Sequence, residues 1–247
     1  MLYLTIDRGN TSTKCAVWEG RELRQYIRVD EDELQVLVAF INQWQPQKGI
    51  LSSVIEEDEI FTGRFQSETG LPLMVLDWKT PLPIEFAYPR TTLGSDRAAA
   101  AVGAWLKNGR KPVLVVDCGT AMTIDLINSE GFFLGGNITA GKTLRFKSLH
   151  EATSLLPLVT DDGEISLFGN DTNSAIRDGV IMGMVYEIEG SLKSASGIVE
   201  DPIVYMTGGD AGILLPLLQK RGIQAENCPW LVDYGLLEIL LFNIDEI

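Results

Sequence analysis

The feature that most constrains the fold of this chain is a short pattern that occurs twice, about 110 residues apart. Residues 3–11 form an apolar run that ends in Asp, any residue and Gly, followed closely by Thr. Residues 113–120 repeat the apolar run and the same ending. In each copy a second apolar run and a turn with glycine follow. The repeat predicts two related halves, each starting with a strand hairpin bent around an acidic turn.

The segments outside the two hairpins alternate between helical and extended patterns. Apolar residues recur at spacings of three and four, as on one face of a helix, in segments 31–45, 97–107, 144–155, 174–194 and 211–221. Short apolar runs that are typical of strands lie at 50–54, 75–76 and 202–207. This order predicts an α/β protein with two layered sheets and helices outside them.

A polar stretch at residues 108–112 separates the two copies and is the expected domain boundary. We therefore expect an N-terminal domain of residues 1–110 and a C-terminal domain of residues 111–247. The apolar run at 236–244 could fold back onto the first half, and the sequence leaves this point open.

The composition excludes several classes of partner. The chain has 247 residues and a formal net charge of −14. Such a protein repels phosphate backbones and anionic lipids, so we expect no nucleic acid and no membrane as partner. No window reaches the roughly 18–20 apolar residues that span a bilayer, and Asp7 interrupts the N-terminus where a signal peptide would stay apolar. We expect a cytoplasmic protein. Three widely spaced cysteines and one histidine argue against a disulfide framework or a zinc site.

The first acidic turn, residues 7–14, combines the groups that phosphate chemistry needs. Gly9 lets backbone N–H groups approach a phosphate closely, and the neighbouring hydroxyl groups can donate to its oxygens. Lys14 adds a point charge. A purely structural hairpin explains one such turn equally well, because glycine and polar residues also serve tight turns. Two copies favour a two-lobed site that closes on a nucleotide.

Asp96 precedes a run of four alanines and lies in the first turn of a predicted helix. It could simply cap that helix. It could also act as a base, because a helix N-terminus stabilises the charged form of a carboxylate. The neighbouring Arg97 offers a planar, two-pronged hydrogen-bond donor.

Taken together, these motifs resemble the type III pantothenate kinases of the actin-like kinase and ATPase superfamily. The matching segments are 7–14, 94–97, 116–125, 135–138 and 207–209. The resemblance implies two actin-like, ribonuclease H-like domains with a nucleotide cleft between them. It also implies ATP-dependent phosphorylation of pantothenate to 4'-phosphopantothenate, the first step of coenzyme A biosynthesis.

The resemblance also assigns roles to individual residues. The residues expected to bind ATP are Asp7, Arg8, Gly9, Asn10, Thr11, Ser12, Thr13, Lys14 and Thr120. The residues expected to bind pantothenate are Tyr88, Gly94, Ser95, Asp96, Arg97 and Thr172. Asp96 would be the catalytic base, and Asp117 would bind a monovalent cation, K⁺ or NH₄⁺. Mg²⁺ would accompany ATP. A homodimer is implied, because in the family the residue that matches Thr172 reaches into the partner's site.

Three positions depart from the family pattern. Tyr88 lies about one residue closer to the Gly-x-Asp-Arg motif than the family tyrosine does, so it could be a packed tyrosine instead. Asp171 stands where the family has Asn, and Ala140 where it usually has Pro. Asp125, two residues beyond Thr123, is interpreted as a solvent-exposed residue at a strand edge and is not included in the site.

Other readings of the sequence remain open. Residues 136–143 satisfy the P-loop pattern G-x-x-x-x-G-K-T, but the expected preceding strand, residues 132–134, is short and belongs to a hairpin, whereas a P-loop follows a buried parallel strand. The chain could be an actin-like kinase or phosphatase for another metabolite, because a fold does not name its substrate. It could also be a non-catalytic regulator that retains the fold.

Overall fold

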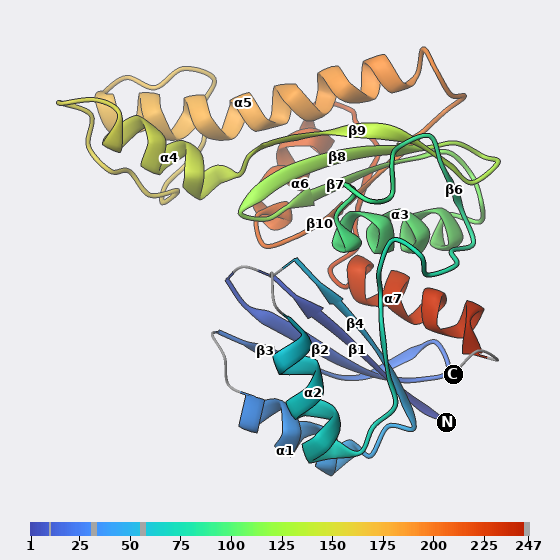
Figure 1. Ribbon diagram of the computed structural model, residues 1–247. Helices are drawn as coiled ribbons and strands as arrows, with labels where there is room; N and C mark the ends of the chain where they lie inside the picture. Colours follow the sequence, from blue (N-terminus) through green and yellow to red (C-terminus); the bar gives the residue numbers. More distant parts are fainter. Residues whose placement is uncertain (10, 31–33, 55–57, 245–247) are drawn as a thin grey trace. The chain divides into compact units, whose positions relative to one another are not determined.

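The computed structural model describes residues 1–9, 11–30, 34–54 and 58–244. The chain divides into two compact units, each built on a β-sheet (Figure 1). Unit 1 comprises Met1–Gly109, Gly131–Phe133 and Trp230–Ile247, and unit 2 comprises Arg110–Glu130 and Leu134–Pro229. No helix among the described residues is long and apolar enough to cross a membrane.

The sheet of unit 1 has the strand order β3-β2-β1-β4-β5. Its strands are β1 (Leu2–Arg8), β2 (Thr13–Glu19), β3 (Glu22–Val29), β4 (Lys48–Ser53) and β5 (Leu73–Val75). The first three strands are antiparallel neighbours, whereas β1, β4 and β5 run parallel. The carboxyl ends of β1 and β4 therefore meet at one edge of the sheet.

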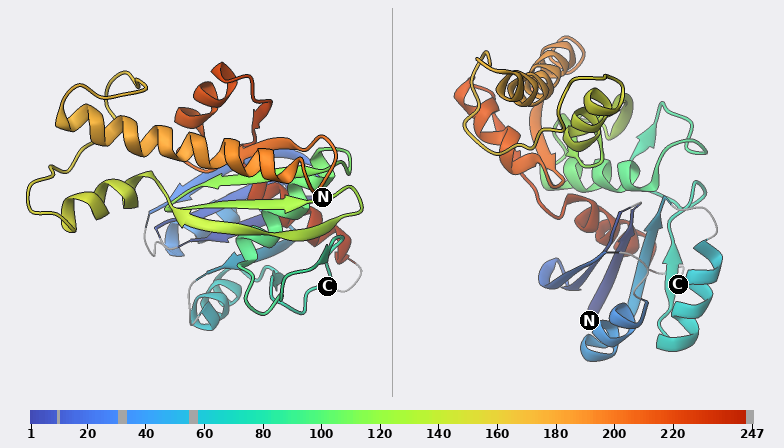
Figure 2. Two further views of the ribbon diagram at one scale, coloured as in Figure 1. Left: turned by 90° about the horizontal axis from the view of Figure 1, so that it is seen from above. Right: turned by 90° about the vertical axis from the view of Figure 1, so that its left-hand side faces the viewer.

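Successive side chains of β1 point to opposite faces of this sheet. Leu4 and Ile6 point into an apolar core that contains residues of α1 (Leu34–Trp44) and α2 (Asp58–Thr69). Thr5 and Asp7 lie on the opposite face, where Thr5 donates a hydrogen bond to Asp233 of α7 (Leu231–Phe242). Asp7 therefore lies on the face of the unit 1 sheet that α7 covers, and Figure 2 shows this helix beside the strands.

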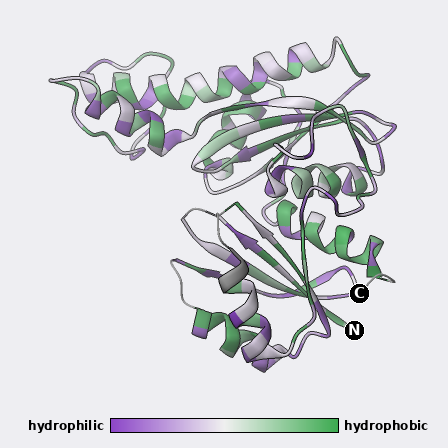
Figure 3. Ribbon diagram, in the orientation of Figure 1, coloured by the Kyte–Doolittle hydropathy of each residue, from purple (hydrophilic) through white to green (hydrophobic). Residues whose placement is uncertain are grey.

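Helix α7 packs against α3 (Ser95–Lys107) at close range. A Cβ atom added to Gly235 would lie 1.8 Å from the carbonyl oxygen of Ala99, and one added to Gly103 would lie 2.7 Å from that of Leu231. Both helices are rich in apolar residues (Figure 3). The apolar C-terminal run thus belongs to unit 1. The sequence left open whether this run folds back onto the first half of the chain, and the structure shows that it does.

Unit 2 contains the strands in the order β11-β10-β7-β8-β9. They are β7 (Val113–Cys118), β8 (Ala121–Ile127), β9 (Phe132–Ala140), β10 (Ile203–Thr207) and β11 (Ala225–Asn227). The helices of unit 2 are α4 (Lys142–Glu151), α5 (Thr172–Ala195) and α6 (Ala211–Lys220). The short β6 (Glu85–Phe86) pairs with the first two residues of β9, which belong to unit 1.

One face of the unit 2 sheet is apolar and is covered by α5 and α6. Leu114 and Val116 of β7 join Ile181 and Val185 of α5 and Leu214 of α6 in a single buried cluster. Because side chains alternate along β7, Asp117 projects from the other face. Unit 2 therefore presents its acidic turn away from its own apolar core.

The predicted elements are largely confirmed, with differences at their ends. Helix α4 ends at Glu151, whereas the pattern extended to residue 155, and the start of the helix expected at 31–45 lies outside the described residues. The acidic run at 56–59 is typical of a solvated helix start, and α2 begins there at Asp58, whereas helix α7 was not predicted. Strand β9 runs to Ala140, six residues beyond the short strand expected at 132–134.

Candidate functional site

The first acidic turn joins β1 to β2, which pair in register up to Arg8 and Thr13. The backbone N–H of Gly9 donates to the carbonyl of Ser12 at 3.1 Å and closes the turn. Asp7 lies directly across from Lys14, and the Lys14 ammonium donates to the Asp7 carboxylate at 3.0 Å. Asp7 is buried, and the Lys14 side chain is about one-third exposed at 34%. The turn thus holds a buried carboxylate beside a reachable cation.

The other predicted ATP-binding residues of this turn differ in accessibility. Thr11 is exposed, whereas Ser12 and Thr13 are buried. Arg8 is buried as well, and its guanidinium group lies 4.4 Å from the centre of the Phe61 ring. Asn10 lies outside the described residues. The described residues predicted from this turn thus lie in one hairpin, whereas Thr120, the remaining predicted ATP ligand, lies in the second turn.

The N-terminus of α3 is fixed to the end of β4 beside this turn. Ser52 pairs with Asp7 across the parallel strands. The Ser52 hydroxyl donates to the Ser95 hydroxyl at 2.8 Å, and Ser95 donates in turn to the carbonyl of Ser53 at 3.1 Å. Ser95 therefore anchors the first turn of α3, and Asp96, at the same edge as Asp7.

The Asp96 carboxylate accepts the backbone N–H of Arg97 at 2.8 Å. A Cβ atom at Gly94 would lie only 2.5 Å from an Asp96 oxygen, so glycine at this position leaves room for the carboxylate. Burial, together with the negative charge of Asp7, raises the pKa of Asp96 despite this hydrogen bond. The expected stabilisation of the charged form at the helix N-terminus is therefore outweighed. A carboxylate with a raised pKa is a stronger base.

Arg97 lies in an aromatic setting within unit 1. Its guanidinium carbon is 5.5 Å from the centre of the Tyr88 ring and 5.8 Å from that of Phe133. Tyr88 meets Phe133 edge to face at 6.1 Å. Arg97 is buried, whereas Tyr88 is half-buried. The structure thus places Tyr88 beside Arg97, while its contact with a substrate stays a prediction.

The second acidic turn joins β7 to β8 as a hairpin whose loop is one residue shorter than that of the first. Asp117 pairs with Thr123, and the N–H of Gly119 donates to the carbonyl of Ala121 at 3.2 Å. Asp117 is half-buried, and Thr120 is exposed at the tip of the turn. Both hairpins of the repeat therefore form as the sequence predicts.

The surroundings of Asp117 come from the end of β10. Thr207 pairs with Asp117, and Gly208 follows with a φ of +86°. A Cβ atom at Gly208 would lie 2.5 Å from an Asp117 carboxylate oxygen and 2.6 Å from the carbonyl carbon of Cys118. Gly208 thus lets the backbone after β10 approach the Asp117 carboxylate closely, with no room for a side chain.

Thr172 is the first residue of α5 and is exposed. Asp171 caps this helix by accepting the N–H groups of Asn173 and Ser174 at 2.8 and 3.1 Å, and Ser174 completes a capping box. These contacts lower the pKa of Asp171. Aspartate, which stands where the family has asparagine, therefore holds Thr172 on an ordered helix end.

Comparison with known proteins identifies the family. A family model for type III pantothenate kinases matches residues 3–194. The chain is also 37% identical over 250 residues to the type III pantothenate kinase of Azobacteroides pseudotrichonymphae, covering 98% of this chain and 97% of that protein. This chain belongs to the type III pantothenate kinase family.

Solved structures confirm the fold. A protein from Campylobacter jejuni, described as a Baf family transcriptional activator, matches with a TM-score of 0.68 at 22% identity, covering 98% of this chain and 99% of that one. The ROK hexokinase of Thermus thermophilus matches with a TM-score of 0.56 at 15% identity, covering 98% of both chains. At such identities the likeness concerns the fold alone, which is that of the actin-like kinases.

The P-loop pattern is not a P-loop in this type III pantothenate kinase. Gly136 to Ala140 are part of strand β9, and α4 begins at Lys142, so no phosphate-binding loop separates strand from helix. Lys142 instead forms ion pairs with Asp161 and Asp210.

Among the buried carboxylates of this family member that the sequence did not indicate are Asp125 and Asp233. Asp125 was interpreted as exposed, which is wrong: it is 1% exposed, and a Cβ atom at Gly136 would lie 1.9 Å from one of its oxygens. Asp233 is also buried, and burial together with the charge of Asp7 raises its pKa to about 7. For Asp125 a usable signal was the alternation along β8, which places Thr123 and Asp125 on the same face of the strand. No local pattern in the sequence indicates that Asp233 accepts a hydrogen bond from Thr5.

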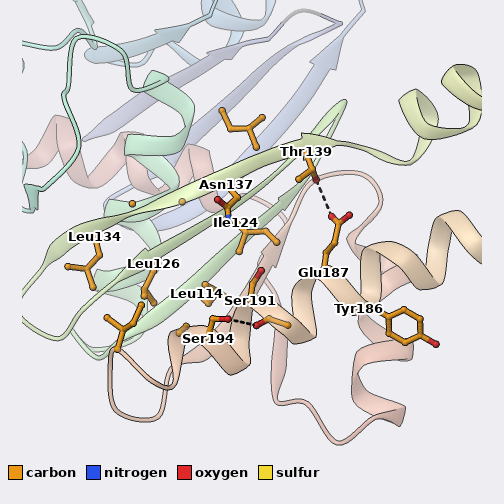
Figure 4. Close-up of a pocket in the computed structure, with 16 residues that line it drawn as sticks. Leu114, Ile124, Leu126, Leu134, Asn137, Thr139, Tyr186, Glu187, Ser191 and Ser194 are labelled. Carbon is orange, nitrogen blue, oxygen red and sulfur yellow. Dashed lines mark hydrogen bonds between the residues drawn. The ribbon is translucent and has the colours of Figure 1, made fainter.

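Unit 2 of this kinase-family chain also contains an open pocket of about 780 Å³ (Figure 4). Leu114, Ile124 and Leu126 of the sheet form one wall, and α5 lines the other with residues such as Glu187. Glu187 accepts a hydrogen bond from Thr139. The predicted site residues that the structure describes all lie outside the lining of this pocket.

Proposed function

We propose that this protein transfers the γ-phosphoryl group of ATP to pantothenate and forms 4'-phosphopantothenate, the first step of coenzyme A biosynthesis. Membership of the type III pantothenate kinase family over nearly the whole chain carries the proposal. The arrangement at the edge of the unit 1 sheet supports it, because a candidate phosphate turn and a candidate base occur there together.

In this proposal the hydroxyl groups and amides of the first turn bind phosphate oxygens, and Lys14 contributes a positive charge that Asp7 holds in place. Thr120 contributes from the second turn. Mg²⁺ enters with ATP and offsets the charge of its phosphates. The carboxylate of Asp7 and the hydroxyl groups beside it are oxygen donors of the kind that Mg²⁺ or its waters accept.

Asp96 acts as the base. The oxygen of the pantothenate hydroxyl bonds to the γ-phosphorus, the bond from phosphorus to the bridging oxygen breaks, ADP leaves, and the hydroxyl proton passes to Asp96. The raised pKa of Asp96 makes its carboxylate a better acceptor. Because phosphoryl transfer has a loose transition state, positioning supplies most of the acceleration. Ser95 and its contacts with β4 provide that positioning for Asp96.

Arg97 recognises the substrate carboxylate. Its planar guanidinium group can donate two parallel hydrogen bonds, and the rings of Tyr88 and Phe133 restrict its orientation. Gly94, Ser95 and Tyr88 complete the proposed contact surface for pantothenate.

Two finer proposals concern unit 2. Asp117 binds a monovalent cation, K⁺ or NH₄⁺, and its half-buried carboxylate at the end of β7, an oxygen ligand, supports this assignment. Thr172 serves the site of a partner subunit in a homodimer, and its exposure at an ordered helix end supports this role.

The test is to supply purified protein with ATP, Mg²⁺ and a panel of hydroxy acids and to identify the products by mass spectrometry. We expect phosphorylated pantothenate as the main product. A pantothenate analogue that lacks the terminal hydroxyl group is the matched control and should give none. Phosphorylation of another acceptor in preference to pantothenate would show a different kinase, and ATP binding without turnover on any acceptor would favour a regulator.

A further inference from the structure

Lys142 lies between two carboxylates in unit 2. Its ammonium group is 2.9 Å from an oxygen of Asp210 and also contacts Asp161. The Lys142 side chain is only 12% exposed. Burial lowers its pKa, but the hydrogen bonds from Lys142 to Asp161 and Asp210 more than offset this effect and leave the pKa raised. Lys142 is therefore a charged residue committed to an ion-pair network.

This network flanks the second acidic turn on both sides. On one side, the N–H of Gly141 donates to the carbonyl of Thr120 at 3.0 Å, and a Cβ atom at Gly141 would lie 2.1 Å from the carbonyl oxygen of Gly119. On the other side, the N–H of Asp210 donates to the carbonyl of Cys118 at 3.1 Å. The turn is held at both of its ends by backbone groups.

The Lys142–Asp210 ion pair joins these two flanks. Gly141 precedes Lys142 directly, and Asp210 supplies both the backbone donor and the carboxylate. The contacts therefore form a closed ring that runs from Thr120 through Gly141, Lys142 and Asp210 to Cys118. Without the ion pair, the beginning of α4 and the beginning of α6 would be tied to the turn separately.

We propose that Lys142 is a positioning residue that holds the turn Cys118–Ala121 in its ATP-binding shape by closing this ring through Asp210. The proposal rests on the proposed function of this turn as part of the ATP site. Lys142 acts on the nucleotide through the turn, and its charge also offsets two carboxylates that would otherwise repel phosphate groups.

The direct test is the dissociation constant of ATP, measured by calorimetry on the purified full chain without pantothenate. Lys142→Met should weaken ATP binding about tenfold or more, which corresponds to about 1.4 kcal/mol. In steady-state assays the KM for ATP should rise by a similar factor, while kcat and the KM for pantothenate change little. Lys142→Arg keeps the charge and should bind ATP within about twofold of the wild type.

Lys147→Met is the matched control, because Lys147 is an exposed lysine on the same helix. It should leave ATP binding unchanged. If Lys142→Met does not fold, Asp210→Asn removes the ion pair while retaining the backbone donor, and it should weaken ATP binding in the same way. The double variant should then be no weaker than the single one, since both changes break one interaction.

Wild-type affinity for ATP in Lys142→Met or Asp210→Asn, with only a lower melting temperature, would overturn the proposal and leave a purely structural ion pair. Binding as weak in Lys142→Arg as in Lys142→Met would also contradict it. A wild-type protein that binds ATP but does not phosphorylate pantothenate would refute the proposed function alone, because the comparison of ATP affinities does not depend on the acceptor.

Discussion

In the first turn Asp7 is paired with Lys14 of its own hairpin, whereas in the second turn Asp117 faces the backbone of a distant glycine, Gly208. In both hairpins the glycine two residues after the acidic residue donates the closing backbone hydrogen bond, but Asp7 pairs with Lys14 and Asp117 with Thr123, so the second loop is one residue shorter. The source of the surrounding groups differs as well. The first turn carries its own cation, and the second is enclosed by segments that arrive later in the chain.

The difference shows how a repeated backbone motif can serve two tasks. A lysine within the hairpin neutralises Asp7 and favours the binding of phosphate groups. Across from Asp117 stands Thr123 and not a lysine, and the role proposed for Asp117 is to bind a monovalent cation, while the Lys142–Asp210 pair lies beside the turn. The repeat therefore specifies the local fold, while long-range contacts specify the electrostatics of each copy.

The largest expected effect is on kcat, and it distinguishes a residue that acts in the chemical step from one that binds the nucleotide. Asp96→Asn removes the base but keeps the side-chain shape, so kcat should fall about 10²- to 10⁴-fold. The dissociation constant of ATP, measured by calorimetry, should stay within about twofold, because Asp96 is proposed to contact the acceptor. An unchanged kcat would remove Asp96 from the chemistry and favour a capping role.

The second prediction concerns Asp233, whose pKa is raised by burial and by the charge of Asp7. Asp233 titrates at about 7 in the folded protein against 3.8 as its ordinary value. A raised pKa contributes stability that is fully present below about pH 4 and is lost as the pH rises through about 7. Asp233→Asn removes this titration.

The free energy of unfolding of Asp233→Asn, taken relative to the wild type, should therefore rise by roughly 3 kcal/mol between pH 5 and pH 8. Denaturant melts at both pH values measure it. The acceptor oxygen for Thr5 is retained in the amide, so a loss of packing should be small. A difference that is the same at both pH values would show that Asp233 is already ionised at pH 5.

A third prediction tests the close approach of Gly208 to the second turn. Gly208→Ala places a methyl group against Asp117 and forces a positive φ on alanine, so it should destabilise the protein by about 2 kcal/mol or more. The matched control is Gly209→Ala, where nothing lies within 4 Å of the added atom. Thermal melts of the two variants should differ clearly. Equal melting temperatures would mean that the loop after β10 moves freely.

The smallest effect concerns the cation itself. Asp117→Asn should raise the K⁺ concentration for half-maximal activity about tenfold, because one unit of ligand charge is lost. Asp7→Asn should weaken ATP binding without this change in K⁺ dependence. Titrations with KCl at constant ionic strength measure both. The same K⁺ response in the two variants would remove the functional difference between the turns.

The sequence predicts those parts of the site that depend on neighbours in the chain. The alternation of apolar residues before Asp7 and Asp117 and the glycines after them specify both hairpins locally. The predicted helix at 97–107 likewise placed Asp96 at a helix start, where α3 now begins at Ser95.

The remainder depends on contacts between residues far apart in the chain, which periodicity cannot reveal. Asp233 meets Thr5 across 228 positions, and Lys142 meets Asp161 across 19. The exposure of Asp125 was misjudged because an acidic residue on a strand usually faces water, whereas here the backbone of Gly136 covers it. Such residues become visible only when distant segments are placed in space.

The central claim is that this protein is a pantothenate kinase, and ADP release from ATP and Mg²⁺ tests it most directly. The rate should be measured with and without pantothenate, in potassium buffer and then in sodium buffer. We predict turnover that requires pantothenate and is faster in potassium. No increase in ADP release on addition of pantothenate in either buffer, by a protein that still binds ATP, would contradict the claim.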